Sequence, residues 1–234
     1  MTIFAHYFGN LVVDMKLIDI TGPIYPGMWA YEPPYPELEY VEIPQPPWVK
    51  TQVYASEVRG LCTQTGTYLE TSAHINPDGP CLDQVELRDL FQRDTVIINL
   101  PARTKARQPI LREELEASLG DFAIKPGLAI IVGTGWGQYW KDDFYLSDAP
   151  YFTSEAMSWL LAKVPFLLGA DSPRWDHLEK PQGFWEKLFA SGTLLLAPVV
   201  NIEQIKVKTC KLVVLPLKLS SICAAPARAV LVIE

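Results

Sequence analysis

Apolar runs alternate with helical stripes over much of the chain. Near-continuous apolar segments at 95–100, 128–134 and 166–170 predict strands that are covered on both faces. Helices are predicted at about 84–91, 111–119, 153–163 and 182–191, and further strands at about 17–21, 193–200, 211–217 and 227–233. Strands and helices alternate and then strands alone follow, which predicts an α/β (mixed α+β) fold, a mixed sheet with helices packed outside.

The stretch from residue 63 to residue 74 carries a different pattern. β-branched threonines are frequent in it and favour extended backbone. Alternate side chains of an extended segment share one face. The even positions of this stretch are Gln64, Gly66, Tyr68, Glu70, Ser72 and His74. This row of donors, acceptors and titratable groups predicts a functional surface; the alternative is a solvated edge strand.

Four residues of this row are candidate catalytic groups. Glu70 and His74 form a candidate general acid–base pair, because histidine titrates near neutrality and a carboxyl group can exchange protons beside it. Tyr68 and Gln64 are candidate hydrogen-bond donors to a developing oxyanion. The sequence has no Gly-x-Ser-x-Gly arrangement and no Gly-rich nucleotide loop, which argues against a serine hydrolase and a nucleotide-binding protein.

A segment rich in proline and aromatic residues occupies positions 29–48. Proline fixes φ, so such a segment can hold its shape without regular hydrogen bonds. Leaving large aromatic residues such as Trp29 and Tyr31 in water is costly. We therefore expect this segment to roof a pocket or to form an interface rather than to act as a surface linker.

Composition and charge restrict the partners. The 234 residues, 49% apolar and 20% charged, suit a globular protein with a substantial core. The net charge of −7, without a Lys/Arg cluster, argues against nucleic acid, and no run approaches the ~18 apolar residues of a membrane span. The start lacks a basic region typical of a signal peptide, and the four cysteines lack C-x-x-C spacing. A cytoplasmic protein with reduced thiols is expected.

The polar stretch resembles the signature H-x-G-T-H-x-D-x-P-x-H of the cyclase family, which includes kynurenine formamidase and isatin hydrolase. Gly66, Thr67 and His74 match it. Further anchors follow in the family's order: Pro26-Gly27-Met28, Thr134-Gly135-Trp136, Gly169, Asp171 and Asp176, and the segment 225–230. The resemblance covers about residues 17–233. It implies a barrel-like swivelling β/β/α domain over 16–234, an extension or dimer arm at 1–15, and a homodimer or homotetramer.

The resemblance also implies a zinc or manganese site, yet most of its ligand positions are substituted here. Gln64 and Tyr68 stand at histidine positions, and Glu70 replaces the bridging aspartate. The distal histidine and glutamate positions fall on Trp185 and Ala197. Neither residue can coordinate a metal, and tyrosine does so well only when ionised, which is uncommon near pH 7. We therefore expect no metal cofactor, with Trp185 forming an aromatic wall.

Three classes of function stay open. The first is a metal-independent cyclase, isomerase or dehydratase acting on a small carbonyl-bearing metabolite, with substrate-binding candidates Trp29, Tyr31, Trp185, Asp171 and His177. The second is a metal-dependent hydrolase of a lactam, lactone or N-formyl bond. Its metal site would be rebuilt from Glu70, His74, Asp171 and His177, or bind weakly at Glu70 and His74 alone. The third is a non-catalytic protein that binds a ligand or partner.

Overall fold

The computed structural model describes residues 3–8 and 11–233, with side chains from Met15 onward. The strands are β1 (Ile3–Phe8), β2 (Leu11–Asp19), β3 (Glu39–Glu42), β4 (Ser56–Arg59), β5 (Tyr68–Glu70), β6 (Arg93–Asn99), β7 (Pro109–Ile110), β8 (Ala129–Gly133), β9 (Tyr151–Phe152), β10 (Leu167–Ala170), β11 (Leu194–Ala197), β12 (Thr209–Pro216) and β13 (Ala224–Ile233). The helices are α1 (Leu87–Leu90), α2 (Arg112–Leu119), α3 (Ser154–Leu161) and α4 (Trp185–Ala190). The short 3-10 turns are η1 (Ser72–His74), η2 (Leu82–Gln84), η3 (Trp136–Tyr139) and η4 (Ile202–Gln204).

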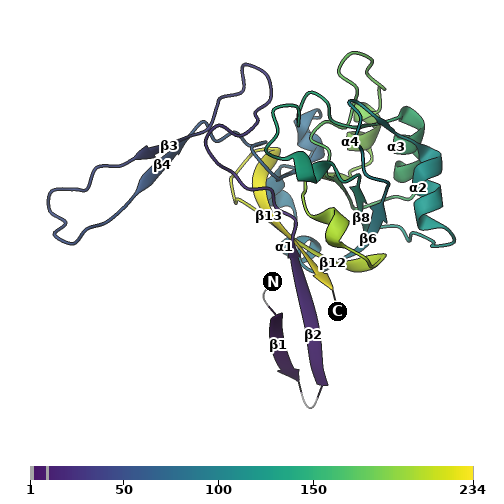
Figure 1. Ribbon diagram of the computed structural model, residues 1–234, viewed down its shortest axis with the longest axis horizontal. Helices are drawn as coiled ribbons and strands as arrows, with labels where there is room; N and C mark the ends of the chain where they lie inside the picture. Colours follow the sequence, from purple (N-terminus) through teal and green to yellow (C-terminus); the bar gives the residue numbers. More distant parts are fainter. Residues whose placement is uncertain (1–2, 9–10, 234) are drawn as a thin grey trace.

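Seven strands close into a mixed barrel (Figure 1). Their order is β13–β12–β6–β8–β10–β11–β5, and β5 pairs back to β13. Neighbours among β6, β8, β10 and β11 run parallel, whereas β5, β12 and β13 pair antiparallel with their neighbours. The predicted α/β class with a barrel-like mixed sheet is confirmed.

The central strands are buried on both faces, as their continuous apolar sequences predict. In β6, Val96 and Ile98 pack in a cluster with Leu115 of α2 and Met157 of α3. Ile97, which points to the other face, packs in a second cluster whose members come from strands all around the barrel. This second cluster is the barrel interior, and the first fills the layer between the barrel and the helices. The helices therefore lie outside the sheet, as expected.

Two hairpins leave the barrel (Figure 1). Strands β3 and β4 form a separate two-stranded antiparallel sheet, and their hairpin projects away from the body. Strand β1 pairs with the first part of β2, whose last part pairs with β13. The predicted extension at 1–15 contains β1 and the start of β2, and its remaining residues lie outside the described part. No described helix is long and apolar enough to cross a bilayer.

Candidate active site

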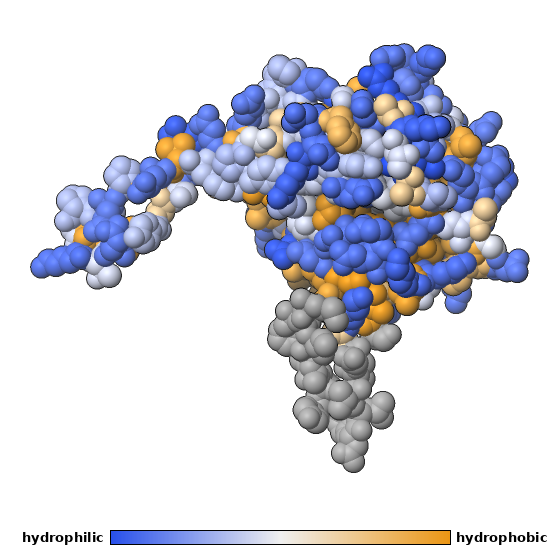
Figure 2. Space-filling model, viewed as in Figure 1, coloured by the Kyte–Doolittle hydropathy of each residue, from blue (hydrophilic) through white to orange (hydrophobic). Residues whose placement is uncertain are grey.

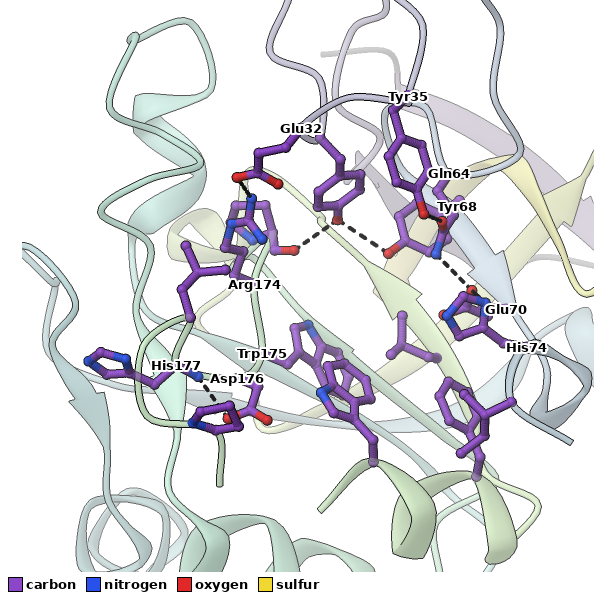
Figure 3. Close-up of a pocket in the computed structure, with 18 residues that line it drawn as sticks. Glu32, Tyr35, Gln64, Tyr68, Glu70, His74, Arg174, Trp175, Asp176 and His177 are labelled. Atoms are coloured by element: carbon purple, nitrogen blue, oxygen red, sulfur yellow. Dashed lines mark hydrogen bonds and ion pairs between the residues drawn. The ribbon is translucent and has the colours of Figure 1, made fainter. Parts of the chain in front are cut away.

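A cavity of about 580 Å³ lies beside β5 and the start of α4 (Figure 3). Its polar wall is formed by Tyr31, Tyr35, Gln64, Tyr68, Glu70 and His74. Its apolar wall is formed by Trp175, Trp185, Phe189 and Leu195. The loop 173–181 forms its rim and contributes Arg174 and His177. The cavity thus combines an apolar surface with a few converging polar groups, as small-molecule sites do.

Strand β5 directs Tyr68 and Glu70 into this cavity. The two side chains are separated by one residue and share a face, while Leu69 between them is fully buried in the barrel interior. β5 is paired on both edges, with β11 and with β13. The predicted alternation is confirmed within β5, and pairing on both edges holds the two functional side chains on a rigid element.

Outside β5 the prediction of one long extended row is wrong. Gly66 has a φ of 69°, and a Cβ atom there would lie 2.7 Å from Cγ1 of Ile24. This left-handed glycine turns the chain before β5, so Gln64 reaches the cavity from a loop. After β5 the backbone forms the 3-10 turn η1, which carries His74 to the cavity. Turns on both sides of a short strand therefore bring together the four candidate catalytic residues.

Glu70 is the centre of the polar wall. Its Oε1 accepts a hydrogen bond from Nε2 of Gln64 at 2.8 Å and lies 3.0 Å from Nδ1 of His74 (Figure 3). Burial raises the pKa of Glu70 to about 8, although the hydrogen bond from Gln64 lowers it, and burial lowers the pKa of His74. The raised pKa of Glu70 and the lowered pKa of His74 both favour the uncharged form of the residue concerned. Near neutral pH Glu70 therefore holds a proton beside a neutral imidazole.

Tyr68 is kept protonated and is oriented by a second tyrosine. The hydroxyl of Tyr31 donates to the carbonyl oxygen of Pro173 at 2.9 Å and lies 3.3 Å from the hydroxyl of Tyr68. A hydroxyl has one proton, so Tyr68 donates to Tyr31 in this arrangement. Burial raises the pKa of Tyr31 to about 12 and that of Tyr68 well above its usual range. Tyr68 is thus a neutral hydroxyl at physiological pH, and it can donate to a substrate oxygen when its proton turns away from Tyr31.

The aromatic wall is a stack that continues from Trp175 through Trp185 to Phe189. The Trp175 and Trp185 rings lie 6.5 Å apart at 22°, and the Trp185 and Phe189 rings lie 6.0 Å apart at 16°. Trp185 is the first residue of α4, and it lines the cavity as expected. Ala197 at the end of β11 is buried in register with Tyr68. Neither position offers a ligand atom.

Cys223 is a neighbour of this site that sequence reasoning missed. Its Sγ lies 3.9 Å from Nδ1 of His74, and ligand atoms of Glu70, His74 and Cys223 all lie within 4.8 Å of one another. The residue directly precedes β13, whose Ala224 is in register with Glu70. Because the sequence does not reveal that β5 pairs with β13, it gives no signal for this proximity. Tyr35 and Arg174 were likewise not identified as cavity residues.

The alternative metal site of Glu70, His74, Asp171 and His177, considered for a hydrolase, is not brought together among the described residues. Among the described residues, the one cluster of His, Cys, Asp or Glu side chains whose ligand atoms lie close enough together to hold an ion consists of Glu70, His74 and Cys223. The Nδ1 atom of His177 accepts backbone N–H bonds from Glu179 and Lys180, and its ring packs edge-on against Tyr151. His177 therefore lines the rim of the cavity but points away from Glu70 (Figure 3).

Two substrate-binding candidates lie outside the cavity lining. Asp171 is fully buried between β8 and β10 and accepts hydrogen bonds from Thr134 and Trp136. Trp29 packs against Trp140 and Tyr145, with ring centroids 5.1 Å and 5.4 Å away. Of the aromatic segment, Tyr31 lines the cavity as expected, whereas the expectation that Trp29 roofs it is not met.

The comparisons with known proteins agree with this architecture. The family profile described as "Putative cyclase" matches residues 18–177. The comparison with curated proteins gives no significant match. The chain belongs to the cyclase family.

Several solved structures share its fold. One is an isatin hydrolase bound to the product analogue thioisatinate, with a TM-score of 0.78, 19% identity, and coverage of 94% of this chain and 93% of that one. Isatin hydrolase A from Ralstonia solanacearum gives a TM-score of 0.78 and 17% identity, covering 94% and 92%. A potential metal-dependent hydrolase with cyclase activity gives a TM-score of 0.72 and 21% identity, and the match covers 94% of this chain and 98% of that one. At these identities the likeness concerns the fold.

The residues present do not fit the metal site that the family resemblance implies. Trp185 and Ala197 supply no donor, and Tyr68 is held neutral. Gln64 directs its amide nitrogen to Glu70, and its oxygen accepts a hydrogen bond from Tyr35. Four ligand positions are therefore occupied by groups that are not directed at a common ion, and no catalytic step is assigned to a metal here.

Proposed function

We propose that this chain is a metal-independent enzyme of the cyclase family that acts on a small carbonyl-bearing molecule. The reaction is a cyclisation, an isomerisation or a dehydration by general acid–base and hydrogen-bond catalysis. The observation that carries the proposal is the contact of 3.0 Å between Glu70 and His74 on the cavity wall. A protonated carboxyl group and a neutral imidazole form one acid and one base that are both usable near neutral pH.

The roles of the residues follow from their protonation. His74 takes a proton from the carbon next to the substrate carbonyl, and Tyr68 donates a hydrogen bond to the oxyanion that develops on the carbonyl oxygen. In a dehydration, Glu70 gives its proton to the departing hydroxide, which leaves as water. The imidazolium then returns its proton to the Glu70 carboxylate across their contact. In an isomerisation the proton returns to a different substrate atom, and no group is lost.

The aromatic stack supports a substrate with a flat apolar portion. A ring or conjugated system would lie against Trp185 and Phe189, while its carbonyl faces the polar wall. The cavity volume of about 580 Å³ suits a metabolite of moderate size.

A substrate screen tests the proposal. The purified protein is incubated, with and without a chelator, with a panel of aryl N-formamides, lactams, lactones and aromatic β-hydroxy ketones. Mass spectrometry distinguishes the reactions, because dehydration loses water, isomerisation keeps the mass, and hydrolysis adds water. We expect mass loss or an unchanged mass with altered retention, and no effect of the chelator. Conversion only by addition of water, abolished by the chelator, would contradict the proposal.

A metal-dependent hydrolase is the second candidate. It is favoured by the convergence of ligand atoms from Glu70, His74 and Cys223, and by the likeness of the fold to hydrolase structures. Three donors and a water could complete a zinc site. Such an enzyme would open a lactam, lactone or N-formyl bond.

We also propose that the chain is a homodimer held by the hairpin β3–β4. A two-stranded hairpin is marginally stable in water by itself. Its aromatic residues Tyr40, Trp48 and Tyr54 are 50%, 79% and 85% exposed, and Figure 2 shows apolar residues among polar ones on this arm. They expose roughly 400 Å² per arm. Two reciprocal arms and the surfaces they cover would bury roughly 1,600 Å², the area of a standard stable interface.

Replacing the two most exposed aromatic residues of the arm tests the dimer. Trp48→Ser combined with Tyr54→Ser removes most of the apolar surface at the tip, so we expect a monomer at micromolar concentration. Sedimentation equilibrium should give twice the mass of one chain for the wild type and for the control Lys50→Ser. A wild-type protein that sediments as a monomer would contradict the proposed dimer.

A further inference from the structure

The rim of the cavity opposite the proton-transfer pair carries a cationic side chain, Arg174. Figure 3 shows Arg174 and Glu32 on one side of the cavity and Glu70 and His74 on the other. Among the described residues that line the cavity, Arg174 is the only arginine or lysine. Its side chain is 14% exposed, so water screens its charge less than it screens a charge on the open surface.

The guanidinium group of Arg174 is held in place, but its donors are not all used. Its Nε donates to the carbonyl oxygen of Leu146 at 3.2 Å, and its Cζ lies 5.5 Å from the centroid of the Tyr31 ring. Its Nη2 donates to the carboxylate of Glu32. Within the described part of the chain, Nη1 makes no hydrogen bond. Because a guanidinium group binds a carboxylate best through two parallel bonds, the contact with Glu32 leaves room for a better-placed carboxylate.

Glu32 is a carboxylate that a ligand can replace. Its side chain is 64% exposed, so it can turn into water while the guanidinium of Arg174 stays in place. The hydrogen bond from Arg174 lowers the pKa of Glu32, because the guanidinium stabilises an ionised carboxylate at this position. An ion pair with an exposed partner contributes little to stability, so exchanging Glu32 for another carboxylate costs little.

The other acidic groups of the cavity do not compete for Arg174. Glu70 holds a proton near neutral pH, since burial raises its pKa to about 8. Asp176 accepts backbone N–H bonds from His177 at 2.8 Å and from Gln182 at 2.7 Å, which direct its carboxylate at its own loop. An anionic ligand group would therefore be drawn to the Arg174 side of the cavity.

One tyrosine side chain spans the space between Arg174 and the polar wall. The ring of Tyr31 lies beside the guanidinium, and its hydroxyl lies 3.3 Å from that of Tyr68. A molecule of moderate size can therefore contact the guanidinium with one end and Tyr68 with the other.

We infer that Arg174 binds a carboxylate group of the substrate, so that the substrate is a carboxylic acid with a separate carbonyl group. The carboxylate replaces that of Glu32 and accepts hydrogen bonds from Nη1 and Nη2, while the carbonyl faces Tyr68. That the bound acid is a substrate rests on the proposed function, whereas the binding of a carboxylate does not.

The experiment compares the binding of an aromatic keto acid with that of its neutral ester. The probes are 3-benzoylpropanoate and methyl 3-benzoylpropanoate, titrated into the protein by isothermal titration calorimetry. We expect the wild type to bind the acid at least tenfold more tightly than the ester. Arg174→Gln should lose this preference and keep its affinity for the ester.

Two further variants separate a binding role of Arg174 from a structural one. Glu32→Gln should bind the acid several times more tightly than the wild type does, because the internal competitor is removed. Arg107→Gln is the matched control and should bind both probes as the wild type does. Arg107 also pairs with a glutamate, Glu179, but it lies outside the cavity lining.

The outcomes distinguish failure of this inference from failure of the proposed function. Equal binding of acid and ester by the wild type, or a preference that survives in Arg174→Gln, overturns the carboxylate site. Acid binding by Glu32→Gln that is no tighter than in the wild type overturns the exchange, and this variant decides if Arg174→Gln loses ester binding as well. A preference that requires Arg174, without turnover of any panel compound, would leave the site standing and overturn the enzyme.

Discussion

Glu70→Gln lowers turnover by roughly a hundredfold or more, while the protein stays folded. Glutamine keeps the shape of the side chain and can still contact Gln64 and His74, but it holds no transferable acidic proton. A general acid or base contributes about 10²–10⁴ to the rate. The measurement is kcat for the best panel substrate, with Glu186→Gln on the exposed face of α4 as the matched control.

The pH profile of the wild type provides a second readout of the same residue. With the pKa of Glu70 raised to about 8 and that of His74 lowered, turnover should form a plateau that falls above pH 8 and again below the ordinary range of histidine. The alkaline limb should be absent from the residual activity of Glu70→Gln. Full turnover of both Glu70→Gln and His74→Asn, together with loss in Trp185→Ala, would show that the site acts by shape and that the acid–base roles are wrong.

The raised pKa also has a consequence for stability. When the pKa of a carboxyl group is higher in the folded state than in the unfolded state, the group destabilises the folded protein increasingly as the pH rises between the two pKa values. For Glu70 that window runs from the ordinary value of 4.5 to about 8. The free energy of unfolding of the wild type should therefore fall across this window relative to that of Glu70→Gln, by on the order of 5 kcal/mol in total.

Asp171→Asn should reduce the free energy of unfolding by about 3–5 kcal/mol. The Asp171 carboxylate accepts bonds from the backbone N–H of Thr134 at 2.9 and 3.0 Å, from the Thr134 hydroxyl at 2.8 Å, and from the backbone N–H of Trp136 at 3.0 Å. Burial raises its pKa to about 6, against the effect of these hydrogen bonds, so the group is ionised at neutral pH. An asparagine would direct its own N–H groups at buried donors.

Urea unfolding followed by tryptophan fluorescence measures this loss. Asp143→Asn, at an exposed position of the neighbouring segment, is the control and should change stability by less than about 0.5 kcal/mol. A loss below about 1 kcal/mol in Asp171→Asn would mean that the carboxylate is not needed to hold the ends of β8 and β10 together.

Sequence patterns predicted the parts of the fold that depend on local burial. The run 95–100 is nearly continuously apolar because β6 packs against helices on one face and the barrel interior on the other. The arm β3–β4 was not predicted, because its prolines and exposed polar residues give no alternating pattern. Hairpin pairing there depends on two segments that lie apart in the sequence.

The candidate site was predicted only in part, because some of its geometry is local and the rest depends on contacts between distant segments. Tyr68 and Glu70 share a face by the geometry of any strand, so their direction could be derived from spacing alone. The position of Cys223 depends on β5 pairing with β13, a contact that closes the barrel across more than half of the chain. The position of Asp171 was expected near the pocket, yet the hydrogen bonds of Thr134 and Trp136 keep it inside the protein.

The most direct test of the central claim compares turnover with metal content in the same sample. Protein purified without chelator is analysed for zinc and manganese, dialysed against chelator, analysed again and assayed with the best panel substrate. We predict well under one metal ion per chain at the start and the same turnover after dialysis. Stoichiometric metal whose removal abolishes turnover, and whose return restores it, would contradict a metal-independent reaction.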